Sequence, residues 1–265
     1  EDMPYAPFDG IVLTDTFQLY EQDKDMIADL LPDNSERRTA QKERDIQVIV
    51  GNPPYSSGQK NANDNAANVF YPNLDGEIRT RYAEPSKSGN KNGLYNSYIK
   101  AISWSLQRLE GDGVMAFVAS NGWTEKPFAD AMRKHLAATS SKLFIFNLRG
   151  DVRKNMLTKG AAQEGENIFD NGSMNGNCIF LIVRNSSKSG HASISYHDIG
   201  DDLTLKEKRR RIVSYQSVNK MSEAQKWVVV EPNENGDWLD QRDETLSEYL
   251  IVGTKRGAKT LTIFN

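Results

Sequence analysis

The chain contains little cysteine and histidine, the residues on which many protein sites are built. Cys178 is the only cysteine among 265 residues, which excludes a disulfide framework and a cysteine-based zinc site. It lies in an apolar run and is expected to be a buried, reduced core residue. The histidines, His135, His191 and His197, lack the spacing of metal ligands and the context of a catalytic triad. We therefore expect neither a metal site nor nucleophilic hydrolysis.

Long apolar runs are also missing. No stretch of eighteen apolar residues occurs, and the first residues lack the pattern of a secretory signal. These absences predict a cytoplasmic protein with no membrane partner. With 38% hydrophobic residues, the chain can form one large domain, or one domain with a small appendage.

The chain has no excess of positive charge. Its 33 basic and 36 acidic residues give a net charge of −3, so the overall composition does not indicate a nucleic-acid-binding protein. Any DNA contact must come from local patches, and residues 206–211 form the densest one. Arg209, Arg210 and Arg211 are the candidates for phosphate contacts, with a solvated helix face as the alternative. Smaller basic groups occur at Arg149, Arg153 and Lys154.

Apolar runs that alternate with amphipathic segments predict an α/β fold. Strands are expected at residues 10–17, 46–50, 114–119, 143–148, 178–183 and 192–196, and helices at 35–44, 94–109 and 125–136. The last two strands, with a polar turn between them, predict an antiparallel hairpin at the edge of the sheet. Beyond residue 200, a basic helix, a short strand at 227–230 and a polar stretch indicate a connector. We therefore expect a catalytic domain at residues 1–200 and a connector at 201–265.

The most informative motif is Asn52-Pro53-Pro54-Tyr55, directly after the strand expected at residues 46–50. Open α/β sheets bind ligands at the carboxyl ends of their strands. A conjugated exocyclic amine is a poor nucleophile, and two hydrogen-bond acceptors can localise its lone pair. The Asn52 side chain and the Pro53 carbonyl provide such acceptors on a turn that the prolines stiffen. Tyr55 can stack on a base taken out of a duplex, so the motif predicts methyl transfer to an amine. The alternative is a rigid turn without chemistry.

Two further segments support this interpretation. Asp15 and Phe17 follow an apolar run, so the acid could accept a hydrogen bond from a cofactor's adenine while the ring packs beside it. The alternative for Asp15 is a helix N-cap. Phe169 lies in the loop before the strand expected at 178–183, where it could cover the second face of a base held by Tyr55. Its alternative role is that of a hydrophobic anchor for the loop.

With these segments in this order, residues 10–200 resemble the gamma-class S-adenosylmethionine-dependent adenine-N6 DNA methyltransferases. The chain is most similar to the methylase portion of large single-polypeptide restriction–modification enzymes of type ISP. The resemblance implies a Rossmann-like methyltransferase sheet, S-adenosylmethionine as cofactor, DNA as partner and base flipping. It implies catalytic roles for Asn52, Pro53, Pro54 and Tyr55. It also implies base contact by Phe169 and cofactor contact by Asp15 and Phe17, with Thr16 as an extra residue between them.

The sequence departs from this family in one respect. The glycine-rich loop that binds the methionine end of the cofactor would precede residue 10, and no Gly-x-Gly after an apolar strand occurs before Asn52. We therefore expect a sheet that is incomplete in its N-terminal half and a piece that is inactive alone. The parent would carry helicase and nuclease domains upstream, and residues 201–265 would lead toward a target-recognition domain.

Two alternative functions remain open. Methyltransferases of protein glutamine or of RNA share the same four-residue motif, because they face the same problem of amine activation. The chain could also be a non-catalytic DNA-binding piece in which the motif is vestigial.

Overall fold

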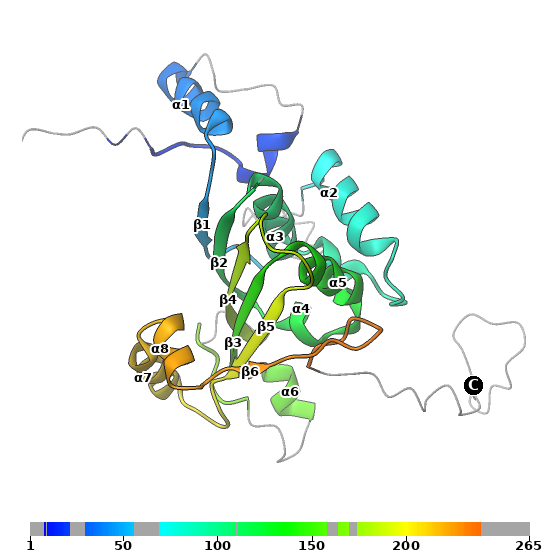
Figure 1. Ribbon diagram of the computed structural model, residues 1–265. Coiled ribbons are helices and arrows are strands. Elements are labelled where there is room, and N and C mark those ends of the chain that lie inside the picture. The colour runs from blue at the N-terminus through cyan, green and yellow to red at the C-terminus, as the bar shows by residue number, and fades with distance from the viewer. Residues whose placement is uncertain are drawn as a thin grey trace, which may run out of the picture.

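The computed structural model describes residues 8, 10–21, 30–55, 69–109, 111–157, 164–169 and 174–239, and within them one six-stranded mixed sheet forms the centre of the molecule (Figure 1). Its strands are β1 (Val48–Gly51), β2 (Gly113–Ser120), β3 (Lys142–Arg149), β4 (Asn177–Arg184), β5 (Ser193–Asp198) and β6 (Val228–Val229). They lie in the order β1-β2-β4-β3-β5-β6. β1 is parallel to β2 and β3 is parallel to β5, whereas β4 is antiparallel to both of its neighbours.

The described helices are α1 (Pro32–Glu43), α2 (Pro72–Ile78), α3 (Ser97–Arg108), α4 (Gly122–Glu125), α5 (Asp130–Thr139), α6 (Val152–Leu157), α7 (Leu205–Tyr215) and α8 (Val218–Glu223). Local caps determine where several of them begin. Asn96 accepts a hydrogen bond from the Tyr98 amide at the start of α3. Thr204 and Glu207 form a reciprocal capping box at the start of α7. No described helix combines the length and the apolar character needed to cross a bilayer.

The sheet separates two hydrophobic clusters. Successive side chains of a strand point to opposite faces, and β3 shows this directly. Leu143 and Ile145 belong to the main core, which also contains side chains of α2, α3 and α5. Phe146 and Leu148 belong to a second cluster that includes residues of α7. Figure 1 shows α7 and α8 apart from the α2, α3 and α5 group.

The α/β class is confirmed, but two element predictions are wrong. Residues 10–17 form no strand; instead a 3₁₀ helix spans Thr16–Tyr20, and the Asp15 side chain caps it by accepting a hydrogen bond from the Phe17 amide. β4 and β5 do not form a hairpin, because β3 lies between them. The antiparallel edge pair is instead β5 with β6.

Residues beyond 200 pack onto the sheet as far as the structure describes them. The Val230 amide donates to the Ile194 carbonyl, and the Trp238 ring packs edge-on against Trp123 at 5.6 Å. Arg133 and Asp237 form a fully buried ion pair at 2.9 Å. The predicted boundary at residue 200 stays a prediction, while residues 201–239 contribute to the folded core.

Candidate functional site

The Asn52-Pro53-Pro54-Tyr55 motif lies at the carboxyl end of β1, where the sequence predicts a ligand. β1 pairs in parallel with β2, with Gly51 opposite Phe117. Pro53 is buried, whereas Asn52 is exposed and makes no hydrogen bond to another described residue. The motif therefore places at the sheet edge a buried proline and an amide side chain that no other described residue binds.

Tyr55 is held by contacts at both ends of its side chain. Its ring packs edge-on against Tyr98 of α3 at 6.3 Å between centroids, and its hydroxyl donates to the Val118 carbonyl of β2 at 3.4 Å. Burial raises the pKa of Tyr55 above its usual value, so the phenol stays neutral. A neutral, fixed ring is suited to stacking rather than to acid–base chemistry.

Phe169 lies opposite Tyr55, as the sequence predicts for the second face of a base. The two ring centroids are 6.4 Å apart, and the rings are tilted by 55°. Phe169 is 37% exposed and belongs to neither hydrophobic cluster, and its predicted contact with a base stays a prediction. A base between two parallel rings needs a separation of about 7 Å, twice the contact distance between carbon atoms. The pair is thus close to the required spacing, and a rotation of Phe169 would open the slot.

The loop that carries Phe169 is fixed by Asn167, a residue that the sequence analysis missed. The buried Asn167 side chain accepts hydrogen bonds from the Phe169 amide and from Asn177. It donates to the carbonyls of Gly150 and Asn175. The Asn-x-Phe spacing of an Asx turn was the available signal. Gly150 has a φ of +86°, and a Cβ there would lie 2.8 Å from the Asn167 Cα, so the loop packs closely on the end of β3.

A cavity of about 570 Å³ lies beside β1 and brings Phe17, Asn52 and Pro53 to one wall. Trp104 of α3 also lines it, and its indole Nε1 is a buried donor without a hydrogen-bond partner in the described part of the chain. The cavity thus combines an aromatic ring, apolar strand residues and available polar groups. This composition fits an adenosine-containing ligand.

Asp15 is not among the residues that line this cavity. Its carboxylate caps the 3₁₀ helix and accepts a hydrogen bond of 2.8 Å from the Tyr71 hydroxyl. The N-cap role is therefore observed. Its predicted contact with a cofactor stays a prediction. The Tyr71 ring also packs edge-on against Phe17, so Asp15 and Phe17 are anchored to the same tyrosine.

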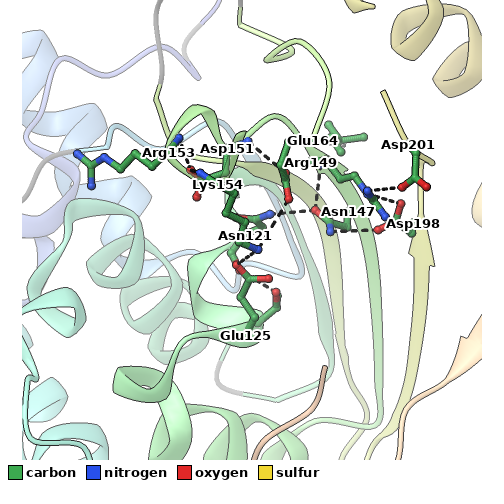
Figure 2. A network of polar contacts seen from close by, with 12 residues as sticks. Asn121, Glu125, Asn147, Arg149, Asp151, Arg153, Lys154, Glu164, Asp198 and Asp201 are labelled. Atoms are coloured by element: carbon green, nitrogen blue, oxygen red, sulfur yellow. Dashed lines mark hydrogen bonds and ion pairs between the residues drawn. The ribbon is translucent and has the colours of Figure 1, made fainter. Parts of the chain in front are cut away.

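The basic residues at and just after the end of β3 differ in their surroundings (Figure 2). Arg149 forms ion pairs with Asp198 at 2.7 Å and Asp201 at 2.5 Å, and Lys154 pairs with Glu125 at 2.7 Å. Arg153 is exposed, and Figure 2 shows its guanidinium extending away from this network. Within the described part of the chain, carboxylates pair with Arg149 and Lys154, and none pairs with Arg153.

The arginines predicted to contact phosphates all lie on α7 but are not equivalent. All three are exposed, but Arg211 also donates to the Ile199 carbonyl at 2.6 Å. Their neighbour Lys208 is fully buried, and its ammonium donates to the carbonyls of Leu148 and Glu164. Burial lowers the pKa of Lys208 to about 8. The helix thus presents Arg209 and Arg210 to a partner and uses Lys208 for packing. Phosphate contact stays a prediction.

The chain is similar to one protein family and to several solved structures. The family described as Eco57I restriction-modification methylase matches residues 12–152. Three solved structures are similar over nearly the whole chain. The ATP-dependent type ISP restriction-modification enzyme LlaBIII bound to DNA has 35% identity and a TM-score of 0.86 over 98% of this chain. A nuclease-deletion mutant of the type ISP enzyme LlaGI in complex with a DNA substrate mimic has 39% identity and a TM-score of 0.83 over 94%.

The third, a DrdV–DNA complex, has 28% identity and a TM-score of 0.74 over 91% of this chain. This chain spans only 17%, 20% and 22% of the lengths of these three proteins, respectively. A comparison with curated proteins found no match. The resemblance to the methylase portion of type ISP enzymes is confirmed.

Proposed function

The chain belongs to the family of Eco57I restriction-modification methylases, and on that premise we propose that it transfers a methyl group from S-adenosylmethionine to N6 of a flipped adenine in DNA. The observation that carries the proposal is the juxtaposition at the end of β1. There, a free Asn52 amide and the buried Pro53 lie next to Tyr55, whose ring faces Phe169. This arrangement combines an amine-binding turn with two aromatic surfaces.

Each residue has a defined role in this proposal. Asn52 Oδ1 and the Pro53 carbonyl accept hydrogen bonds from the two amine hydrogens. These bonds localise the lone pair on the nitrogen, which makes the nitrogen a better nucleophile. Both bonds strengthen as positive charge develops on the nitrogen, so they stabilise the transition state more than the ground state. Tyr55 and Phe169 hold the adenine ring and replace the stacking that it loses in the duplex.

S-adenosylmethionine, when bound, supplies the methyl group. The cavity of about 570 Å³ is suited to its adenosine end, because the rings of Phe17 and Trp104 line it together with polar groups of Thr14, Thr16 and Asn52. The cavity also reaches Asn52, so a ligand there would lie beside the amine-binding turn. Asp15 contributes by capping the turn that presents Phe17.

We infer that DNA and further domains of a larger polypeptide are the partners. LlaBIII, LlaGI and DrdV were solved with DNA or a DNA mimic, LlaBIII is ATP-dependent, and the LlaGI structure is of a nuclease-deletion mutant. These descriptions support the expected helicase and nuclease domains of a restriction–modification system, which we propose acts in the cytoplasm. Arg209 and Arg210 are the proposed phosphate contacts of α7, and replacing them should reduce the salt dependence of DNA binding.

The test is methyl transfer by the full-length protein to DNA, RNA and protein in parallel. Mass spectrometry of the digested products should show N6-methyladenine from DNA. Asn52→Ala should lower the rate at least about 100-fold, in the range seen when a transition-state hydrogen bond is removed, and leave DNA affinity nearly unchanged. The matched control is Asn219→Ala, an exposed asparagine on α8, which should behave like wild type. Methylation of cytosine, RNA or protein, or undiminished turnover by Asn52→Ala, would contradict the proposal.

A further inference from the structure

A second cavity lies beside a neighbour of the aromatic pair. It has a volume of about 880 Å³, and Tyr98, whose ring contacts Tyr55, lines it together with Ser120. We call it the polar cleft. Its other walls carry mostly amide and hydroxyl groups, including Ser88, Asn90, Asn92, Asn96 and Asn175. Such groups donate and accept hydrogen bonds without carrying charge.

The charges of the polar cleft have one sign. Lys126 and Arg153 line the cleft, and among the residues that the structure describes no aspartate or glutamate lines it. Neither cation forms an ion pair with a described residue, in contrast to Arg149 and Lys154. The Lys126 side chain runs along Gly122, where an added Cβ would lie 3.4 Å from its Cδ. The cleft is thus a polar surface with two positive charges that no carboxylate of the described residues pairs with.

The position of the polar cleft indicates what these charges bind. A flipped nucleotide stays joined to its neighbours through the phosphates on both sides, so a strand must pass close to the slot that holds the base. The cleft begins at Tyr98, whose ring contacts Tyr55. We propose that the polar cleft seats the polynucleotide strand next to the flipped adenine, with Lys126 and Arg153 on its phosphates. This inference rests on the proposed function, and it selects a polynucleotide over a protein glutamine as the substrate.

The experiment measures how the full-length protein binds a fluorescein-labelled oligothymidylate that carries one central adenine. A second probe has neutral methylphosphonates at the phosphates flanking that adenine. Wild type should lose at least about tenfold in affinity when those charges are removed. Lys126→Gln/Arg153→Gln should bind the charged probe more weakly and distinguish the two probes less than threefold. Its plot of log affinity against log salt should be shallower by about 1.4, because each phosphate contact to a single strand contributes about 0.7.

Two control variants remove equal charge elsewhere. Lys142→Gln/Lys226→Gln changes exposed lysines outside the cleft and should keep the wild-type preference for the charged probe. Arg209→Gln/Arg210→Gln on α7 should weaken binding yet keep that preference. The single variants Lys126→Gln and Arg153→Gln should each show part of the effect. Circular dichroism and unfolding curves of these variants should match those of wild type, because neither replaced side chain belongs to the hydrophobic core.

The outcomes separate this inference from the proposed function. Equal discrimination between the probes by wild type and the cleft variant would overturn the inference, even if wild type methylates DNA. Displacement of the probe by polyglutamate as readily as by unlabelled oligonucleotide would overturn it too. If discrimination is lost in the cleft variant but no methylated adenine forms, the strand-binding cleft stands and the proposed reaction fails.

Discussion

Phe169 shows how much of this site depends on the surroundings of single residues. It is an ordinary loop phenylalanine in the sequence, and the structure adds that it is partly exposed and lies beside Tyr55. One aromatic–base stack contributes about 1–3 kcal/mol, and extruding a base costs a few kcal/mol. One ring would therefore barely offset extrusion, whereas two rings would hold the base.

We expect Phe169→Ala to lower the methylation rate of the full-length protein at least about tenfold, the loss of one such stack. Phe169→Trp should keep much of the activity because it keeps a stacking surface. The measurement is the fluorescence of 2-aminopurine at the target adenine, which rises when the base leaves the stack. Phe169→Ala should show a smaller rise.

The control is Met174→Ala, which removes a 49% exposed apolar side chain beyond the same loop without touching the aromatic pair. It should flip and methylate like wild type. Equal behaviour of Phe169→Ala and Met174→Ala would mean that the second face of the base is provided by another residue.

At the scale of single residues, the sequence predicts the four-residue motif better than it predicts the side chains that hold the surrounding loops in place. Asn52, Pro53, Pro54 and Tyr55 are contiguous, so their spacing and chemistry can be read together. The four hydrogen bonds of Asn167 involve Gly150, Phe169, Asn175 and Asn177, and three of these partners meet it only through tertiary folding. The ion pairs of Arg149 and Lys154 likewise join separate segments, so the sequence could not show which basic residues are compensated.

Among the elements, α7 combines two roles on opposite faces. Lys208 points into the protein and fixes the helix to the end of β3 through the Leu148 carbonyl, while Arg209 and Arg210 point outward. The Lys208 ammonium also donates to the carbonyl of Glu164, five residues before Phe169. Helix α7, the end of β3 and the segment that leads to Phe169 therefore share one buried ammonium group.

The buried ammonium predicts a specific pH dependence. Burial lowers the pKa of Lys208 to about 8 in the folded protein, below the usual value near 10.5. Between these values the unfolded chain binds a proton that the folded protein does not, so the free energy of unfolding rises with pH. Below about pH 8 both states are protonated and the desolvation cost is fully present.

Urea unfolding of the described domain at about pH 8 and about pH 9.5 should therefore show a stability gain of about 1–2 kcal/mol from this group. Lys208→Met should remove that gain, because methionine has no proton to bind. Lys206→Met, an exposed neighbour on the same helix, should retain it. Identical pH dependence in the two variants would assign the effect to other groups.

The element predictions failed where strand pairing and local conformation depend on tertiary contacts. The apolar runs at β4 and β5 are separated by a polar turn, which is also the pattern of a hairpin. Here β3 occupies the position between them, because its side chains fill hydrophobic clusters on both faces of the sheet. Order along the chain could not show this insertion. At residues 10–17, the Asp15 cap and the packing of Phe17 on Tyr71 favour a 3₁₀ turn over a strand.

For the molecule as a whole, residues 230–239 are tied to the sheet's helical layer by a buried network. The Arg133 guanidinium on α5 pairs with Asp237 and donates to the carbonyls of Trp123, Lys126 and Gly236. Both charged side chains are essentially inaccessible to solvent. The network joins segments about a hundred residues apart in the sequence, so it contributes to global rather than local stability.

Arg133→Met should lower the free energy of unfolding by about 3–5 kcal/mol, because the Asp237 carboxylate would stay buried without the guanidinium. Arg133→Met/Asp237→Asn should recover part of this loss. The control Arg81→Met breaks an exposed ion pair with Glu77 and should cost less than about 1 kcal/mol. Urea denaturation compares the four proteins, and similar losses for Arg81→Met and Arg133→Met would show that the buried pair is energetically unimportant.

The interior position of β4 has a consequence for how the chain acquires its structure. β2 ends at Ser120 and β3 ends at Arg149, but the strand that joins them starts only at Asn177. The centre of the sheet therefore depends on distant pairings, which slow folding because a loop must close before any contact forms. During synthesis on the ribosome, β2 and β3 emerge before β4, so the strand edges that later pair with β4 stay unpaired until it is made. Until it arrives, the nascent chain has exposed apolar strands that favour aggregation and chaperone binding.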